Sequence, residues 1–595
     1  MDEAYIEQVP NLNRMEENHY EGSICKEKSN PAIDTVGNSN TTETDPFAYL
    51  ERSDFTSEKF KIEIRNLPKR YGLRELKKLL NQKLKLGSNK IKVPSKNSFW
   101  IYVCFRSEED KKKAIETLNG YKWKGNVLSA DTALAVPDPL VKKRMLDRGS
   151  EQDNNKKLKL NAGSEKDKLM EAVAPLSMLP YEEQLVQKKQ VIFDVLKSLG
   201  DELVKVNPEL GPIIKAKKEK YNGLPCEVWP IRHAELTSDG YRNKCEFTIG
   251  INEGSGLRTI GFRLGSYVTG SVAVAPIDDV PNVPKRMKEV VSIFQNFIRN
   301  SDLDVFHPVK QEGFWRQLTV RYGFRTDQLM LIVGVHPQKL TDCELKKIME
   351  DIKQFFSEGD GKSCEVTSLF VQLIEKKKSQ EDETVYHHIM GEKCIYEKLL
   401  NRNFRISPQA FFQINTSATE VLYNSIAELA GLNENVTLLD ICCGTGSIGI
   451  CLSDKCGEVL GLEISSKAVE DAKENAAANN IKNAQFFAGK AEEILSSVAF
   501  RASNDTIIAI ADPPRAGLHQ NALVQLRKSQ HINKLVYVSC EPKLAVKNFI
   551  ALGRAPSKMY QREPFLPVKA VPVDLFPHTK HCELLIYFER VLTES

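Results

Sequence analysis

The sequence predicts a multidomain protein of mixed α/β and α+β class, and three observations support this prediction. The chain has 595 residues, which is enough for three or four domains of about 150 residues each. Residues 58–138 follow the order strand, helix, strand, strand, helix, strand. Residues 401–595 alternate apolar strands with amphipathic helices, which is typical of a mostly parallel sheet with helices on both faces.

The composition limits the compartment and the class of partner. Hydrophobic residues make up 41% and charged residues 27% of the chain, as in ordinary globular proteins. The net charge of +4 is small, so any affinity for nucleic acid must come from local patches. The thirteen cysteines show no repeated metal-binding spacing, so we expect free thiols and no metal. No signal peptide or long apolar run is visible, so we expect the protein in the cytosol, in the nucleus or in both, without a membrane span.

The remaining segments differ from these two in composition. Residues 1–57 are polar and poor in aliphatic clusters, which predicts a disordered arm. Residues 139–189 are charged and lack an apolar period, which predicts a linker; its basic clusters resemble a nuclear import signal or are a solvated surface. Residues 190–400 mix short strands with helices and predict a central α+β domain.

A glycine loop opens the last domain. In "VTLLDICCGTGSIGI" a strand ends at Asp440, and Gly444, Gly446 and Gly449 match the GxGxxG pattern of nucleotide-binding loops. A second strand ends at Glu463, about twenty residues later, where an acid would bind ribose hydroxyls. A dinucleotide and S-adenosyl-L-methionine both fit this pattern, and an ordinary strand–helix turn is the remaining interpretation.

The next strand favours one of these cofactors. In "TIIAIADPPRAGL" the strand ends at Asp512 and is followed by two prolines, which force an irregular loop where ligands bind in open α/β sheets. Such a motif resembles nucleic-acid methyltransferases more than dehydrogenases, although a plain turn remains an alternative. We therefore expect S-adenosyl-L-methionine as the cofactor.

Two further side chains complete a candidate site. Cys540 in "YVSCEP" ends the following strand, so it shares an edge with the glycine loop and Asp512. Glu583 begins the last apolar strand, where a carboxylate is costly unless it is paired or functional. A buried structural thiol and a solvated edge position are the alternative interpretations of these two residues.

A thiolate, a base and a methyl donor together suit methylation of carbon 5 of uracil. This carbon is a poor nucleophile until a thiolate adds at carbon 6, and a base must then remove the carbon-5 proton. Because an ordinary thiol is only a few per cent ionised near neutral pH, we expect the pKa of Cys540 to be lowered locally.

Residues 190–595 resemble the RNA 5-methyluridine methyltransferases. The motifs that carry the resemblance are "FRISPQAFFQIN", "LLDICCGTGSIG", "ADPPRAGL", "YVSCEP" and "DLFPHTKHCE". The resemblance implies that Cys540 is the nucleophile and Glu583 the base. It also implies a transfer-RNA substrate methylated in its T-loop. It assigns cofactor contacts to Gln413, Cys442, Glu463 and Asp512.

The chain departs from this family pattern at one position beside the nucleophile. Glu541 stands where the family usually has asparagine. The substitution adds an acid beside a thiol that must ionise, and it alters a position that makes a local hydrogen bond in the family.

Residues 58–138 resemble an RNA recognition motif, whose sheet stacks bases on exposed aromatic side chains. The two stacking positions fall on Trp100 and Tyr102 in "SFWIYVCF", while Glu63 replaces a usual aromatic in "IEIRNLP". We therefore expect RNA binding by this face, weaker than in a complete platform. The alternative is that this sheet binds protein or packs on the catalytic part.

Two rival functions remain open. An exocyclic N-methyltransferase would also use the Asp-Pro-Pro motif, but it would favour an aromatic residue at position 515, where the chain has Arg515, and would not need Cys540. A non-catalytic RNA-binding or tRNA-folding factor would retain the same motifs as remnants.

Overall fold

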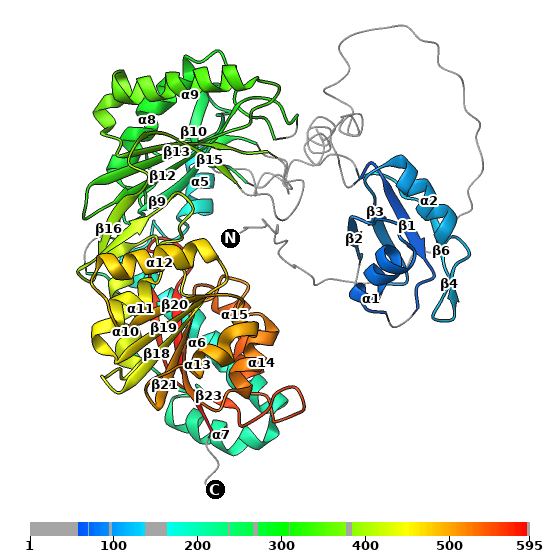
Figure 1. The fold of residues 1–595 in the computed structure, drawn as a ribbon, viewed down its shortest axis with the longest axis vertical. Coiled ribbons are helices and arrows are strands. Elements are labelled where there is room, and N and C mark those ends of the chain that lie inside the picture. Colours follow the sequence, from blue (N-terminus) through cyan, green and yellow to red (C-terminus); the bar gives the residue numbers. More distant parts are fainter. Residues whose placement is uncertain are drawn as a thin grey trace.

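The computed structural model describes residues 58–68, 71–94, 98–136, 164–235, 238–265, 272–308, 310–375 and 384–591 (Figure 1). The arm predicted for residues 1–57 and residues 139–163 of the predicted linker lie outside these ranges. The described chain contains three large sheets, of four, seven and nine strands. Within these ranges, no helix combines the length and apolar character needed to cross a membrane.

The first domain is a four-stranded antiparallel sheet of order β2-β3-β1-β6. Alternation along β1 directs Ile62 and Ile64 into a core with the helices, while Glu63 lies on the other face. The strand and helix order predicted for this region is confirmed. Its elements are β1 (Lys61–Arg65), α1 (Leu73–Lys78), β2 (Lys90–Lys92), β3 (Ile101–Cys104), α2 (Glu108–Leu118), β4 (Lys122–Trp123), β5 (Asn126–Val127) and β6 (Ser129–Thr132).

The central domain is a seven-stranded sheet of order β11-β10-β9-β12-β13-β14-β15. Helices α8 and α9 cover the same face, and their apolar sides share a core with the inward side chains of the strands (Figure 1). The α+β prediction is therefore confirmed for this region. Its elements are β9 (Lys244–Ile251), β10 (Arg258–Arg263), β11 (Val274–Ala275), α8 (Lys285–Arg299), β12 (Trp315–Gly323), β13 (Gln328–Val335), α9 (Asp342–Ser357), β14 (Ser368–Leu373) and β15 (Val385–Gly391).

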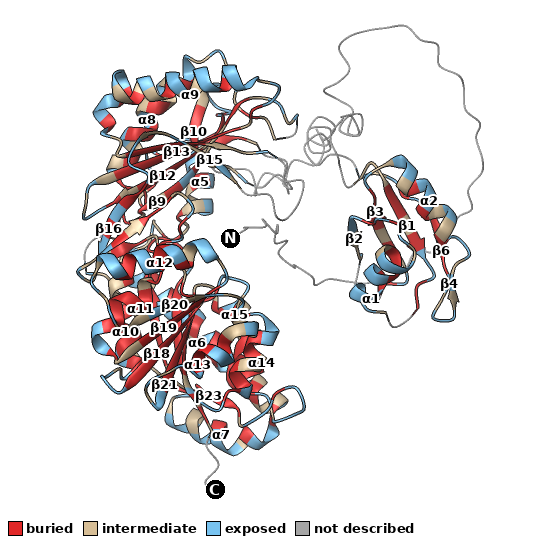
Figure 2. Cartoon of the chain, viewed as in Figure 1, coloured by how far each residue is buried: buried red, intermediate tan, exposed pale blue. Residues whose placement is uncertain are grey.

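The third sheet has the order β20-β19-β18-β21-β22-β24-β23-β7. Its first five strands are parallel, and β24 runs antiparallel to both of its neighbours. Helices cover both faces, so the strands are almost wholly buried (Figure 2). The main elements are α10 (Thr416–Ala430), β18 (Val436–Ile441), α11 (Ser447–Leu452), β19 (Glu458–Glu463), α12 (Ser466–Ala478), β20 (Ala484–Ala488), α13 (Ala491–Ala499), β21 (Thr506–Ala511), α14 (Gln520–Lys528), β22 (Ile532–Ser539), α15 (Pro542–Leu552), β23 (Phe565–Asp574) and β24 (Glu583–Arg590).

The segment before the central sheet differs from the prediction. Helix α5 (Glu165–Val173) and the start of α6 (Tyr181–Val206) fall inside the expected 139–189 linker. Helix α6 packs Ile192, Leu196 and Leu199 into the same core as Leu535 of β22, and the short strand β7 (Glu227–Val228) joins the edge of the third sheet. This part of the predicted central domain therefore belongs to the unit built around the third sheet. An apolar helix stripe predicts burial, but it does not identify the sheet that the helix covers.

A buried ion pair attaches α6 to the end of β23. Lys188 Nζ lies 2.7 Å from Asp574 Oδ1, and both side chains are essentially inaccessible to solvent. Tyr181 donates a hydrogen bond to the other oxygen of Asp574 at 3.0 Å, and Lys188 also donates to the carbonyl of Phe576 at 2.9 Å. The pair therefore fixes the chain just before it turns into β24.

Replacing Lys188 with methionine leaves the buried Asp574 carboxylate without its cation. We expect this change to destabilise the region by about 3–5 kcal/mol, because a single charge is then buried without a partner. Hydrogen–deuterium exchange of the β23 and β24 amides measures the effect. Removing both charges in Lys188→Met/Asp574→Leu should cost less than the single change.

The matched control is Lys205→Met, which breaks an exposed pair with Glu202 at 2.7 Å. It should leave exchange nearly unchanged. Equal effects of Lys188→Met and Lys205→Met would contradict a structural role for the buried pair.

Candidate active site

Four parallel strands bring their carboxyl ends to one edge of the third sheet. Asp440 lies near the end of β18, Glu463 ends β19, Asp512 follows β21 and Cys540 follows β22. Strands that run in the same direction place these residues side by side at that edge. The structure thus brings together residues that lie 100 positions apart in the sequence.

The glycine loop is held by the two acids nearest to it. The Gly444 amide donates a hydrogen bond to Glu463 Oε2 at 3.1 Å, and the Gly449 amide donates to Asp440 Oδ2 at 3.2 Å. Gly446 has φ +78°, and a Cβ atom there would approach the Phe486 ring to 2.9 Å. The loop therefore needs glycine at this position, whereas a Cβ atom at Gly444 would meet nothing within 4 Å, so the backbone there is open to a ligand.

Cys442 precedes this loop in a backbone conformation that is rare for residues with a side chain, with φ +65°. Its side chain is partly exposed. Cys442 follows the end of β18, at the same edge of the sheet as Glu463, so its position agrees with the predicted contact to a cofactor.

Burial makes the carboxylates at this edge hard to ionise. The pKa of Asp440 is raised to about 7 by burial, against the hydrogen bond from Gly449, and its Oδ1 atom has no partner within the described chain. The pKa of Asp512 is raised to about 6 by burial, against a hydrogen bond from Gln413. A positive charge bound at this edge would lower both pKa values.

Gln413 reaches the edge from the segment before α10. Its Nε2 atom lies 3.4 Å from Asp512 Oδ2. Asn243, which precedes β9 of the central domain, donates from its side chain to the Gln413 carbonyl at 2.7 Å, and its amide donates to the Ile414 carbonyl at 2.8 Å. Sequence reasoning missed Asn243, because a lone asparagine carries no signal of a contact made 170 residues away.

The two predicted catalytic residues face each other across an antiparallel strand pair. Ser539 of β22 pairs with Leu584 of β24, so Cys540 and Glu583 are the next residues on the facing strands. Glu583 is 3% exposed, and its Oε2 atom has no hydrogen-bond partner in the described chain. Such a carboxyl group is available to a substrate that enters the site.

Burial raises the pKa of both groups in the free protein. Burial first, and then the neighbouring Glu583, raises the pKa of Cys540 to about 12, while Arg515 opposes this shift. Burial and Asp512 raise the pKa of Glu583 well above its usual range, again against Arg515. The expectation that the thiol pKa is lowered locally was therefore wrong for the free protein, because the sequence did not show how deeply the thiol is buried among acids.

Glu541, the acid beside the nucleophile, is paired with a histidine. His581 Nδ1 lies 3.4 Å from Glu541 Oε2. This contact holds the pKa of Glu541 below its usual range. His581 thus pairs with the acid that replaces the usual asparagine, and this contact joins the strand ends that carry Cys540 and Glu583.

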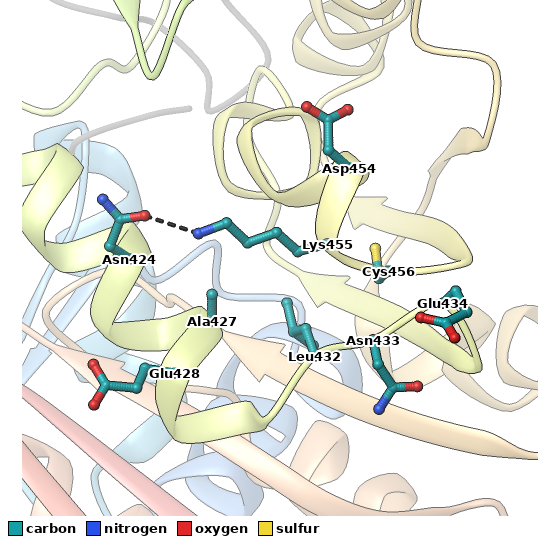
Figure 3. A pocket seen from close by; sticks show the side chains of 9 residues that line it. All are labelled: Asn424, Ala427, Glu428, Leu432, Asn433, Glu434, Asp454, Lys455 and Cys456. Carbon is teal, nitrogen blue, oxygen red and sulfur yellow. Dashed lines mark hydrogen bonds between the residues drawn. The ribbon is translucent and has the colours of Figure 1, made fainter.

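A separate hollow of about 640 Å³ lies at the opposite edge of the sheet, where β18 begins (Figure 3). Lys455 donates a hydrogen bond to Asn424 Oδ1 across it at 3.0 Å. None of the predicted site residues lines this hollow. It is therefore distinct from the candidate active site.

Trp100 and Tyr102, the predicted stacking residues, lie together on the first domain. Their ring centroids are 5.0 Å apart in an edge-to-face arrangement, and both side chains are partly exposed. Glu63 pairs with Tyr102 across the strands, and Arg65 donates to Glu63 at 2.7 Å. Arg65 therefore offsets the acid that replaces an aromatic residue on this face.

In the described part of the chain, no three His, Cys, Asp or Glu side chains lie close enough together to hold a metal ion. The cysteines in the described ranges are all free thiols.

The chain is similar to known proteins along most of its length. A family model described as tRNA (Uracil-5-)-methyltransferase matches residues 344–591, and one described as RNA recognition motif matches residues 62–129. The mouse tRNA (uracil-5-)-methyltransferase homolog A is 40% identical over 546 residues, which cover 92% of this chain and 86% of the mouse protein. The human tRNA (uracil-5-)-methyltransferase homolog B is 39% identical over 437 residues, covering 72% of this chain and 85% of the human protein.

Among solved structures, the tRNA (uracil-54, C5)-methyltransferase of Pyrococcus abyssi in complex with S-adenosyl-L-homocysteine is 25% identical. It covers 69% of this chain and 84% of its own, with a TM-score of 0.48.

The raised thiol pKa predicts slow alkylation of Cys540. At pH 8 we expect iodoacetamide to modify Cys540 on the order of 100-fold more slowly than an ordinary free thiol of pKa about 8.5. The rate should rise with pH up to the limit of protein stability. Peptide mass spectrometry measures it, with the exposed Cys343 as internal reference. Faster modification of Cys540 than of Cys343 at pH 8 would contradict the raised pKa.

Proposed function

This chain belongs to the family of tRNA (uracil-5-)-methyltransferases, and from that premise we propose that it methylates carbon 5 of a T-loop uridine in tRNA through a Cys540 adduct. The methyl donor is S-adenosyl-L-methionine. The observation that carries the proposal is the position of Cys540 and Glu583 on facing strand ends, at the edge that also holds the glycine loop and Asp512.

The residues at this edge fit such a donor. The glycine loop leaves backbone open to close approach, and Glu463 ends β19 where a ribose would be bound. Asp440 is a buried carboxyl and Asp512 a partly buried one, and their raised pKa values would fall beside a cation. Gln413, Cys442, Glu463 and Asp512 are the side chains that we expect to hold the donor. When bound, the donor supplies an electrophilic methyl group and a sulfonium charge that favours the ionised forms of nearby acids.

Cys540 begins the reaction. Its thiolate forms a bond to carbon 6 of uracil, and the electrons of the carbon 5–carbon 6 double bond move to give an enolate, which makes carbon 5 nucleophilic. Because burial raises the pKa of the thiol in the free protein, the thiol proton must pass to water as the site fills. Arg515 favours the thiolate once it forms.

Glu583 completes the reaction. After carbon 5 has gained the methyl group, the Glu583 carboxylate accepts the carbon-5 proton. The electrons of that bond restore the double bond, and the sulfur leaves carbon 6 as the Cys540 thiolate. The unpartnered Oε2 atom of Glu583 is the acceptor that the geometry offers.

RNA contacts extend beyond the reacting base. The target base must leave its stack to reach a buried thiol. Trp100 and Tyr102 offer a second contact on the first domain, where each stacked base would contribute about 1–3 kcal/mol. The T-loop assignment follows from the resemblance of the motifs to the family, and the choice of nucleotide is part of the proposal.

Trapping with 5-fluorouridine tests the mechanism. Fluorine at carbon 5 cannot leave as a proton, so incubation with S-adenosyl-L-methionine and 5-fluorouridine-substituted tRNA should yield a covalent protein–RNA band on a denaturing gel. Cys540→Ala should abolish the band, whereas Cys343→Ala, at an exposed cysteine, should retain it. Glu583→Gln should lower turnover by about 10²- to 10⁴-fold and accumulate the adduct with ordinary tRNA, since proton removal then fails.

Other outcomes would select the rival functions. Methyl transfer to ordinary RNA without any adduct would favour an exocyclic N-methyltransferase. RNA binding with neither adduct nor transfer would favour a non-catalytic RNA-binding factor.

A further inference from the structure

Arg515 is the cation that acts on both proposed catalytic groups, yet it lies on an exposed turn. It favours the ionised forms of Cys540 and of Glu583. Arg515 is an exposed residue at the tip of the turn that follows Asp512. The long side chain needs a firmly placed backbone if its charge is to stay near the thiol, so the structure that holds this turn matters for reactivity.

One backbone hydrogen bond closes the turn, and the side chain of Asn548 holds it in place. The Gly517 amide donates to the Pro514 carbonyl at 2.7 Å, so Arg515 and Ala516 form the tip. The Leu518 amide then donates to Asn548 Oδ1 at 2.7 Å, and Asn548 Nδ2 donates back to the Leu518 carbonyl at 3.3 Å. One buried amide side chain therefore satisfies both backbone groups of Leu518.

Tyr537 completes this contact. Its hydroxyl donates to Asn548 Oδ1 at 2.7 Å and lies 3.3 Å from the Leu518 amide. Tyr537 is fully buried and Asn548 is 4% exposed. Because water cannot replace these bonds, each lost partner would leave a buried polar group unsatisfied.

The packing between the turn and Asn548 is also tight at Gly517. Gly517 has φ +77°, and a Cβ atom there would lie 2.5 Å from Asn548 Oδ1. A side chain at this position would push the turn away from Asn548. The turn, the tyrosine and the asparagine therefore fit as one unit.

The origin of these side chains links the turn to the nucleophile. Tyr537 lies on β22, three residues before Cys540, and Asn548 lies on α15, the helix that begins just after Glu541. The strand and the helix on either side of the nucleophile thus carry the two side chains that hold the turn.

We propose that Tyr537 and Asn548 are positioning residues that hold the 513–518 turn so that Arg515 faces Cys540 and Glu583. Nothing in this role requires either side chain to touch substrate. The inference rests on the proposed function only in naming Cys540 as the nucleophile.

The test measures the pH profile of Cys540 alkylation by iodoacetamide in the full-length protein without RNA. Arg515→Met should move the profile to higher pH and slow the reaction at pH 8 by about 3- to 10-fold, since one pKa unit is tenfold in thiolate. Asn548→Leu and Gly517→Ala should reproduce this shift, and Tyr537→Phe should give a smaller shift in the same direction. Tyr587→Phe is the matched control, because it removes a tyrosine hydroxyl that donates to Glu589 at 2.7 Å and should leave the profile in place.

The decisive comparison is made in the Arg515→Met background. If Asn548 acts through Arg515, adding Asn548→Leu or Tyr537→Phe should cause no further shift. An equal additional shift, or unchanged profiles in single variants that remain folded by circular dichroism, would overturn the proposal. If Asn548→Leu does not fold, Tyr537→Phe decides alone, since it keeps the bonds between Asn548 and Leu518.

The outcome is separable from that of the proposed function. Failure of 5-fluorouridine trapping in the unaltered protein would remove the methylation mechanism and leave the alkylation result intact. A normal trapping result with additive alkylation shifts would remove only the positioning role.

Discussion

The reversal of chain direction at β24 is the constraint on which the rest of the site depends. Strands β18, β19, β21 and β22 run parallel, so their carboxyl ends gather at one edge. A further parallel strand would place its first residue at the opposite edge. Because β24 runs antiparallel to β22, its first residue, Glu583, lies beside Cys540. The proposed base must therefore come from the start of a strand and the nucleophile from the end of one.

This edge concentrates buried acids in the free protein. Asp440, Asp512 and Glu583 all have raised pKa values, with burial as the main cause, and Arg515 opposes the shift at Glu583. Burying carboxyl groups without cations is costly, so the edge is suited to a ligand that brings positive charge. The same burial, with Glu583, raises the pKa of the Cys540 thiol, so little thiolate is present in the free protein.

Segments that precede the catalytic strands hold the edge in place. Helix α6 binds the end of β23 through Lys188, and Gln184 accepts a hydrogen bond from the His578 amide at 2.8 Å. Asn243 of the central region holds the backbone of Gln413. The proposed base and the expected cofactor contact therefore depend on Gln184, Lys188 and Asn243, which lie far from either in sequence. This arrangement couples the central region to the catalytic edge.

The sequence by itself determined most of the element types and singled out the candidate site residues. Period-two and helical patterns predicted the sheets, and the motifs singled out Cys540, Glu583, Asp512 and the glycine loop, because backbone geometry and chemistry restrict which residues can occupy those positions. Only the tertiary structure decided that α6 covers the catalytic sheet, that the free thiol has a raised pKa, and that Asn548 holds the turn of Arg515. These features depend on burial and on contacts between distant segments, and no local pattern in a single sequence encodes either of them.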